Sequence, residues 1–120
     1  MLERAIPTFR MTSSRASETF YTERLGFRVE FVHRPEGVTD DPCYIVLARD
    51  NVEIHLSSHA GDGEPGGIAV IIVESIEELH RELVLRATEI AVGPVDQTWG
   101  TREMYVRDPD ENTLRFQQIR

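Results

Sequence analysis

The chain has 120 residues, 40% of them hydrophobic, and its 21 acidic residues outnumber its 13 basic ones. This length and composition predict one folded domain over residues 1–120, with enough apolar residues to build a core. The formal net charge of −8 repels phosphate and anionic lipid, so nucleic acid and membranes are not expected partners. A cationic ligand is favoured instead, although the charge also serves solubility by itself.

Three further features of the composition narrow the chemistry and the compartment. All 13 basic residues are arginine, which excludes Schiff-base catalysis and a lysine general base. No apolar run approaches the roughly 18 residues of a membrane span, and the first residues lack a secretory pattern, so we expect a cytoplasmic protein. The single cysteine, Cys43, lies among apolar residues, and its surroundings predict a small buried side chain.

The first half of the chain predicts a strand, a helix and three more strands. Arg4–Met11 is rich in β-prone residues, and Ser13-Ser14 offers an N-cap for a helix that Gly26 ends. Apolar patterning then predicts strands at Phe27–His33, Pro42–Ala48 and Val52–Ser57. The glycine-rich, charged stretch 58–66 is expected to be an exposed linker.

The second half predicts the same order of elements. Ile68–Val73 is an apolar strand, and Ser75 with Glu78 forms a capping box that begins a helix. We expect a strand near Glu89–Val92, a loop over 93–100, and a final hairpin around the turn 108–112. The chain is thus predicted to be α+β, with two tandem βαβββ modules at about 1–60 and 66–120. Pairing two such modules closes a cup-shaped mixed sheet around a cavity.

Two segments carry a resemblance to a known family: Phe20-Tyr21-Thr22-Glu23-Arg24-Leu25-Gly26-Phe27 and Asp108-Pro109-Asp110-Glu111-Asn112. They resemble the vicinal oxygen chelate superfamily, and within it the bleomycin-resistance and glyoxalase-like proteins. The resemblance implies a homodimer, in which the cup is often built between two chains by exchange of modules. Glu111 stands where the family usually has glycine, a departure that affects the turn.

The resemblance also implies four positions at which metal-dependent members hold a divalent ion. Counting from the motifs places them at Ile6, His55, Gly67 and Arg115. Isoleucine and glycine lack donor atoms and arginine is cationic, so one ligand of four remains, whereas such an ion usually needs at least three. We therefore expect no metal and no cofactor. Arg115 is expected to pair with an acidic group of a ligand or, alternatively, with Glu53.

His55 has two interpretations: a satisfied hydrogen-bonding residue that faces the cavity, or a ligand contact or proton-transfer group. It also belongs to a metal-capable group with His59, Asp62 and Glu64, but glycine-rich loop residues are rarely fixed enough to coordinate.

Trp99 is either a packing residue or part of the ligand site. The pattern Trp99-Gly100-x-Arg102-Glu103 resembles the bleomycin-resistance proteins, in which an aromatic here lines the drug groove and stacks on planar rings. Phe31 and Tyr44 are weaker candidates for stacking.

The leading hypothesis from the sequence is a metal-independent protein that binds and sequesters a cationic or planar aromatic small molecule, as antibiotic-binding resistance proteins do. It is expected to be a binding protein rather than a catalyst. The alternative is a metal-dependent enzyme of the glyoxalase or dioxygenase type that uses His55. The candidate ligand-binding residues are Trp99, His55, Arg115, Phe31, Tyr44, Arg102 and Glu53.

Overall fold

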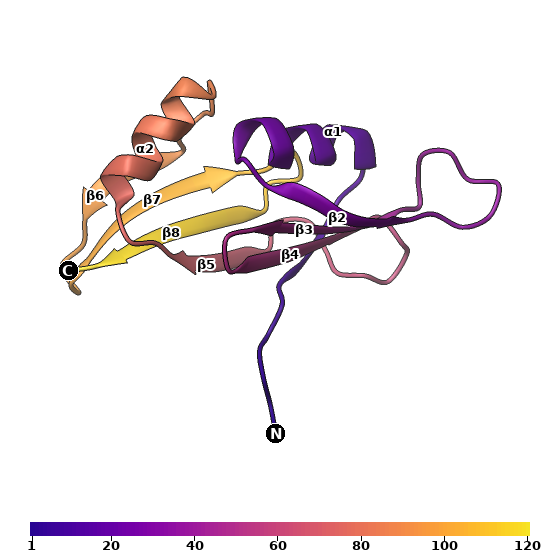
Figure 1. Ribbon diagram of the computed structural model, residues 1–120, viewed down its shortest axis with the longest axis horizontal. Coiled ribbons are helices and arrows are strands. Elements are labelled where there is room, and N and C mark those ends of the chain that lie inside the picture. The colour runs from indigo at the N-terminus through magenta and orange to yellow at the C-terminus, as the bar shows by residue number, and fades with distance from the viewer.

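The computed structural model describes residues 1–120 and contains two four-stranded sheets, each with one helical segment (Figure 1). The first module holds β1 (Thr8–Arg10), α1 (Ser14–Thr19) with the π-helical segment η1 (Phe20–Arg24), β2 (Arg28–His33), β3 (Tyr44–Arg49) and β4 (Val52–Ser57). The second holds β5 (Ile68–Ile72), α2 (Ile76–Leu85), β6 (Val92–Asp96), β7 (Thr101–Arg107) and β8 (Thr113–Ile119). The predicted α+β fold of two tandem βαβββ modules is confirmed.

The two sheets have the same topology. Their strand orders are β1-β4-β3-β2 and β5-β8-β7-β6, and in each the first strand runs parallel to the fourth while the other pairs are antiparallel. The register places Thr8 opposite His55 in the first sheet and Val70 opposite Arg115 in the second. These pairs therefore occupy corresponding places in the two modules.

Two strands differ from the sequence prediction. The first begins at Thr8 instead of Arg4, and residues 1–7 form an extended arm that leaves the body of the molecule (Figure 1). The sixth begins at Val92 instead of Glu89 and runs through Pro94 to Asp96, where a loop was expected. Proline is tolerated there because β6 is an edge strand with a register shift between Val92 and Val95.

Both helical segments begin with the predicted serine caps. Ser13 accepts a hydrogen bond from the Ala16 N–H, and Ser75 accepts one from the Glu78 N–H. The first helical segment ends at Gly26, whose φ of +70° is the left-handed conformation that glycine adopts without a steric penalty.

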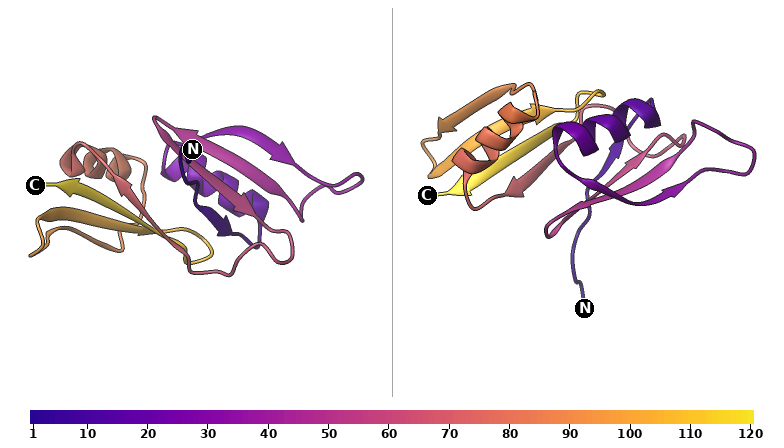
Figure 2. Two further views of the ribbon diagram at one scale, coloured as in Figure 1. Left: turned by 90° about the horizontal axis from the view of Figure 1, so that it is seen from below. Right: turned by 45° about the horizontal axis from the view of Figure 1, so that its top comes forward.

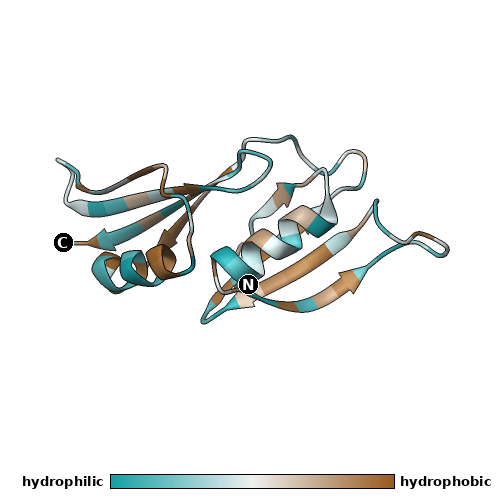
Figure 3. Ribbon diagram, turned by 90° about the horizontal axis from the view of Figure 1, so that it is seen from above, coloured by the Kyte–Doolittle hydropathy of each residue, from teal (hydrophilic) through white to brown (hydrophobic).

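The helical segments cover the same side of the two sheets and leave the other side uncovered (Figures 1 and 2). The strands carry apolar residues beneath the helices (Figure 3), and the core alternates with the strand pleat. Its fully buried strand residues include Ile45, Leu47, Ile54, Leu56, Met104, Val106 and Leu114. The strand side chains that alternate with them form what we call the open face, which includes Phe31, Tyr44, Glu53, His55, Val70, Glu103, Tyr105 and Arg115.

The turn 108–112 fastens the second module to the first. The buried Asp108 carboxylate accepts hydrogen bonds from the Tyr21 hydroxyl and from the side chain and backbone of Asn112. Asn112 also donates to the carbonyl of Arg10, and Asp110 accepts from both the backbone and the hydroxyl of Thr12. The two segments that carry the family resemblance thus meet each other in the structure.

Cys43 is fully buried, as predicted, and burial raises the pKa of its thiol. Neither helix is long and apolar enough to cross a membrane.

Candidate functional site

Three of the predicted residues form a hydrogen-bonded chain on the open face of the first sheet. The Tyr44 hydroxyl lies 2.6 Å from Nδ1 of His55, and Nε2 of His55 lies 2.5 Å from a carboxylate oxygen of Glu53. Tyr44 and His55 also meet edge to face, with ring centroids 5.3 Å apart. Glu53 makes a second contact, 3.3 Å, with the guanidinium of Arg4 on the N-terminal arm. His55 is thereby oriented at both ring nitrogens.

Arg115 lies on the open face of the second sheet and does not reach Glu53 within the chain. Its guanidinium lies over the ring of Tyr105, 5.0 Å from the centroid, in a cation–π arrangement. Its buried Nε has no hydrogen-bond partner, and no carboxylate forms a salt bridge with it. The alternative in which Arg115 pairs with Glu53 is therefore wrong for the single chain, where Glu53 pairs with Arg4 and His55 instead.

Trp99 is exposed, and its indole is held at one edge. The side chain is 66% exposed, and its Nε1 donates a 2.9 Å hydrogen bond to Glu103. The loop that carries it is closed by the hydrogen bond from the Gln97 N–H to the Thr101 carbonyl. The ring face therefore remains free while its orientation is fixed, the arrangement needed for stacking on a planar molecule.

Glu103 organises this part of the second sheet and was not among the predicted residues. It is only 1% exposed and accepts hydrogen bonds from Trp99, Thr101 and Tyr105. Burial alone would raise the pKa of the Glu103 carboxyl, but the hydrogen bonds from Thr101, Tyr105 and Trp99 outweigh it and lower the pKa. The alternation of side chains along β7 could have indicated its role, since Glu103 and Tyr105 lie on the same face of the strand and a buried carboxylate needs hydrogen-bond donors nearby.

The remaining predicted residues lie apart from these groups. Phe31 is on the open face of β2, 56% exposed, and is opposite Val46, which is itself opposite His55. Arg102 points to the opposite side of β7 from Glu103 and forms ion pairs with Glu77 of α2 and Asp96 of β6. The structure therefore does not bring Arg102 to the open face.

The open face does not offer a suitable donor set for a divalent ion at the positions that the family resemblance implies. Ile6 precedes β1 and Gly67 precedes β5, so neither of these two implied ligand positions lies in its strand. A side chain at position 67 would point at Phe9 and Asn112. The open-face residues beside His55 and Arg115 are instead Thr8 and Val70. Of these four, only His55 is a common ligand. Nowhere in the chain do three or more His, Cys, Asp or Glu side chains gather as they do in metal centres, and the loop residue Asp62 bonds to Ser57 instead.

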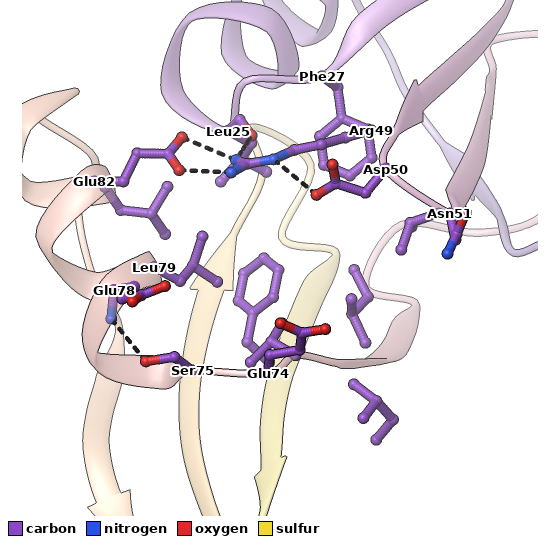
Figure 4. Close-up of a pocket in the computed structure, with 16 residues that line it drawn as sticks. Leu25, Phe27, Arg49, Asp50, Asn51, Glu74, Ser75, Glu78, Leu79 and Glu82 are labelled. Atoms are coloured by element: carbon purple, nitrogen blue, oxygen red, sulfur yellow. Dashed lines mark hydrogen bonds and ion pairs between the residues drawn. The ribbon is translucent and has the colours of Figure 1, made fainter.

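A cleft of about 520 Å³ lies on the helix side, between the modules (Figure 4). None of the predicted residues lines it. Its arginine, Arg49, already donates to both carboxylate oxygens of Glu82 and to the Leu25 carbonyl. Because these polar groups are hydrogen-bonded to one another, we interpret the cleft as the place where the two modules meet. The open face, with the unpaired Arg115 and the exposed ring of Trp99, is the better candidate site.

The chain thus pairs two βαβββ modules, with the helices on one side and an open face of mixed apolar, aromatic and charged side chains on the other. Comparison with family models identifies the family: a model described as "Glyoxalase superfamily protein" matches residues 1–120. The chain belongs to the glyoxalase superfamily, and its fold is that of the vicinal oxygen chelate proteins. No protein with a curated description matches the sequence significantly.

Several solved structures share this fold. A bleomycin resistance determinant encoded on the transposon Tn5 is 24% identical, with a TM-score of 0.75 and coverage of 98% of both chains. A bleomycin-binding protein complexed with bleomycin is 22% identical, with a TM-score of 0.75 and coverage of 99% of this chain and 100% of that one. The antibiotic-binding protein TnmS3 from Streptomyces sp. CB03234 is 17% identical, with a TM-score of 0.73 and coverage of 100% and 99%. At these identities the likeness establishes the fold alone.

Proposed function

We propose that this protein binds and sequesters an antibiotic-like small molecule on the open face, in the cytoplasm and without a metal or other cofactor. The observation that carries the proposal is Trp99, a large aromatic side chain 66% exposed and anchored by its indole N–H to a buried carboxylate. A packing tryptophan would bury its ring, whereas a stacking tryptophan presents a fixed ring to a ligand. The similar structures include a bleomycin-binding protein and an antibiotic-binding protein, which supports the same ligand class.

The charges on and around the open face favour a ligand with a cationic or planar aromatic part. The net charge of −8 attracts cations over distances of about a Debye length, roughly 8–10 Å at ordinary ionic strength. Arg115 adds a local cation without a carboxylate partner. In the proposed complex it takes an acidic group, from the ligand or from a second copy of the chain.

The open face also supports the proposal of a homodimer. Its exposed apolar residues include Phe31, Ile68, Val70 and Ile72, which are 52–59% exposed, and each sheet has two unpaired edge strands. Exposed apolar patches of this kind are common at subunit interfaces. A second copy placed over this face would close the cup and convert the open surface into a ligand pocket.

A second function is favoured by one observation. His55 is paired with the Glu53 carboxylate through Nε2, as catalytic histidines commonly are, which suits the alternative of a glyoxalase- or dioxygenase-type enzyme. In that alternative the Tyr44 hydroxyl, which occupies Nδ1, has to give way to the substrate before His55 can act as a general base. In its metal-dependent form that alternative needs ligands besides His55, and Thr8, Val70 and Arg115 are poor ones.

Metal analysis separates the two functions. Protein purified without chelator is expected to contain far less than one equivalent of zinc, nickel, manganese or iron. Isothermal titration with metal-free bleomycin is expected to show saturable binding that chelator treatment of the protein leaves unchanged. Stoichiometric metal that is lost in a His55→Ala variant would establish the metal-dependent alternative instead.

A further inference from the structure

The hydrogen bonds around His55 determine which of its ring nitrogens carries the proton. A glutamate carboxylate can only accept hydrogen bonds, and the other carboxylate oxygen of Glu53 lies 3.3 Å from the guanidinium of Arg4, which can only donate. The 2.5 Å contact between Glu53 and Nε2 of His55 therefore needs the proton on Nε2. In a neutral imidazole this leaves Nδ1 without a proton and able only to accept.

This tautomer also determines where the hydroxyl proton of Tyr44 points. The hydroxyl lies 2.6 Å from Nδ1, so Tyr44 donates its one proton to His55. The lone pairs of the Tyr44 oxygen are then the remaining hydrogen-bonding capacity, and they can only accept. No other side chain forms a hydrogen bond with this oxygen, and the opposite residues on the two neighbouring strands are Ser57 and His33.

We propose that Glu53, His55 and Tyr44 form a relay that fixes the Tyr44 oxygen as a hydrogen-bond acceptor, so that this part of the open face selects the cationic N–H group of a ligand. The inference rests on the proposed small-molecule binding and names the chemical group recognised: an amidinium, guanidinium or ammonium. Tyr44 contacts the ligand, whereas His55 and Glu53 are positioning residues that act through it. A ligand that offers only acceptor atoms would face a second acceptor and lose a hydrogen bond.

The first test needs no ligand. Nitrogen-15 NMR of the His55 side chain at neutral pH is expected to show a protonated Nε2 and an unprotonated Nδ1. Glu53→Ala removes the acceptor that selects this tautomer, so the variant is expected to populate both tautomers while its circular dichroism spectrum stays unchanged. A wild-type ring that is protonated on Nδ1, or a tautomer that does not respond to Glu53→Ala, would overturn the relay.

The second test uses benzamidine, a planar amidinium, as the probe. Millimolar benzamidine is expected to shift the NMR signals of Tyr44 and His55, and Tyr44→Phe is expected to weaken binding about tenfold, as for loss of one hydrogen bond to a charged group. Glu53→Ala should weaken binding in the same direction. The matched control is Thr8→Val, which removes a hydroxyl opposite His55 that the relay does not use, and its affinity should equal that of the parent.

The outcomes distinguish this inference from the proposed function. Equal benzamidine affinity in the parent and Tyr44→Phe, or no shift at Tyr44 and His55, contradicts selection of a cationic N–H group even if bleomycin binds elsewhere on the open face. Conversely, absence of bleomycin binding with a normal benzamidine response contradicts the antibiotic ligand and leaves the relay intact.

Discussion

Glu103 shows how a single side chain can connect folding with the candidate site. Its carboxylate is the shared acceptor of three donors, Trp99, Thr101 and Tyr105, and its removal would free the indole and leave buried donors without partners. Trp99 itself was proposed from the sequence, because the pattern Trp99-Gly100-x-Arg102-Glu103 resembles the bleomycin-resistance proteins. Its anchor was missed, because which carboxylate is buried depends on long-range sheet pairing.

Replacing Glu103 with glutamine tests this arrangement. The amide keeps the shape but presents an NH₂ group to one of the donors, and a buried donor without a partner costs about 1–3 kcal/mol. We expect Glu103→Gln to lower the free energy of unfolding by about that amount in urea titrations at neutral pH. A variant as stable as the parent would show that the donors find other partners.

The acid dependence of stability should change in the same variant. The hydrogen bonds lower the pKa of Glu103 in the folded protein, so its contribution is present above the unfolded value of about 4.3 and is lost as pH falls through the folded value. The parent should therefore lose more stability than Glu103→Gln between neutral pH and acid. Parallel stability curves for the two proteins would contradict the role of Glu103.

Individual elements were mostly predictable where the determining signal is local. The serine caps, Gly26 and the turn 108–112 lie at the predicted positions because capping and turn formation depend on neighbouring residues. The sixth strand was misplaced for the opposite reason. Its pairing with β7 is irregular around Gly93, where an added Cβ would lie 2.3 Å from the Glu103 carbonyl oxygen, and no local pattern reveals such a close approach.

The C-terminus of α2 provides an element-scale prediction. Ala87 has a φ of +59°, and the bonds from the Ala87 N–H to the Val84 carbonyl and from the Thr88 N–H to the Leu83 carbonyl form the helix-ending motif that usually has glycine at this place. In this left-handed conformation the Cβ of alanine is destabilising by about 1 kcal/mol. Ala87→Gly is expected to raise the free energy of unfolding by roughly 0.5–1 kcal/mol, and the nearby helical Val84→Gly, as a control, should lower it.

The hydrogen bond between Tyr21 and Asp108, which connects the two modules, should make the free energy of unfolding depend on pH in the alkaline range. Burial, together with the neighbouring charge and hydrogen bond of Asp108, raises the pKa of Tyr21 well above its ordinary range. The stabilisation is then complete below the unfolded pKa of about 10 and is lost as pH rises above it, because unfolding releases a proton there.

Tyr21→Phe tests this dependence. The variant should be less stable than the parent at pH 8, since Asp108 loses the hydroxyl donor, and the difference between the two proteins should shrink as pH rises beyond about 10. Thermal unfolding followed by circular dichroism over this range measures it. A difference that stays constant with pH would mean that Tyr21 ionises normally in the folded state.

At the scale of the whole molecule, the sequence predicted the module repeat but could not fix its assembly. Module topology follows from apolar periodicity within about 60 residues, whereas the partner of Arg115 depends on what covers the open face. The counted positions Ile6 and Gly67 fell outside their strands for a related reason: strand starts are set by pairing with β4 and β8, not by local composition.

Oligomeric state is the prediction at this scale. Sedimentation equilibrium at micromolar concentration is expected to give twice the chain mass of 13.7 kDa, because the uncovered apolar face gains from burial. Val70→Asp, which places a charge in that face, should shift the equilibrium to monomer, while the exposed helix substitution Leu85→Asp should not. A parent protein that remains monomeric contradicts the assembly.

The central claim, that the open face binds a planar ligand against Trp99, is tested most directly by fluorescence. Trp99 is the one tryptophan, so titration with metal-free bleomycin is expected to quench the emission with a saturable curve that weakens as salt rises. Stacking contributes roughly 0.5–1.5 kcal/mol and a cation over the ring about as much again. Trp99→Ala, with affinity measured by calorimetry, should therefore bind about tenfold to a hundredfold more weakly. Tight binding that leaves the fluorescence of the parent unchanged, together with equal affinity in Trp99→Ala, would contradict the account.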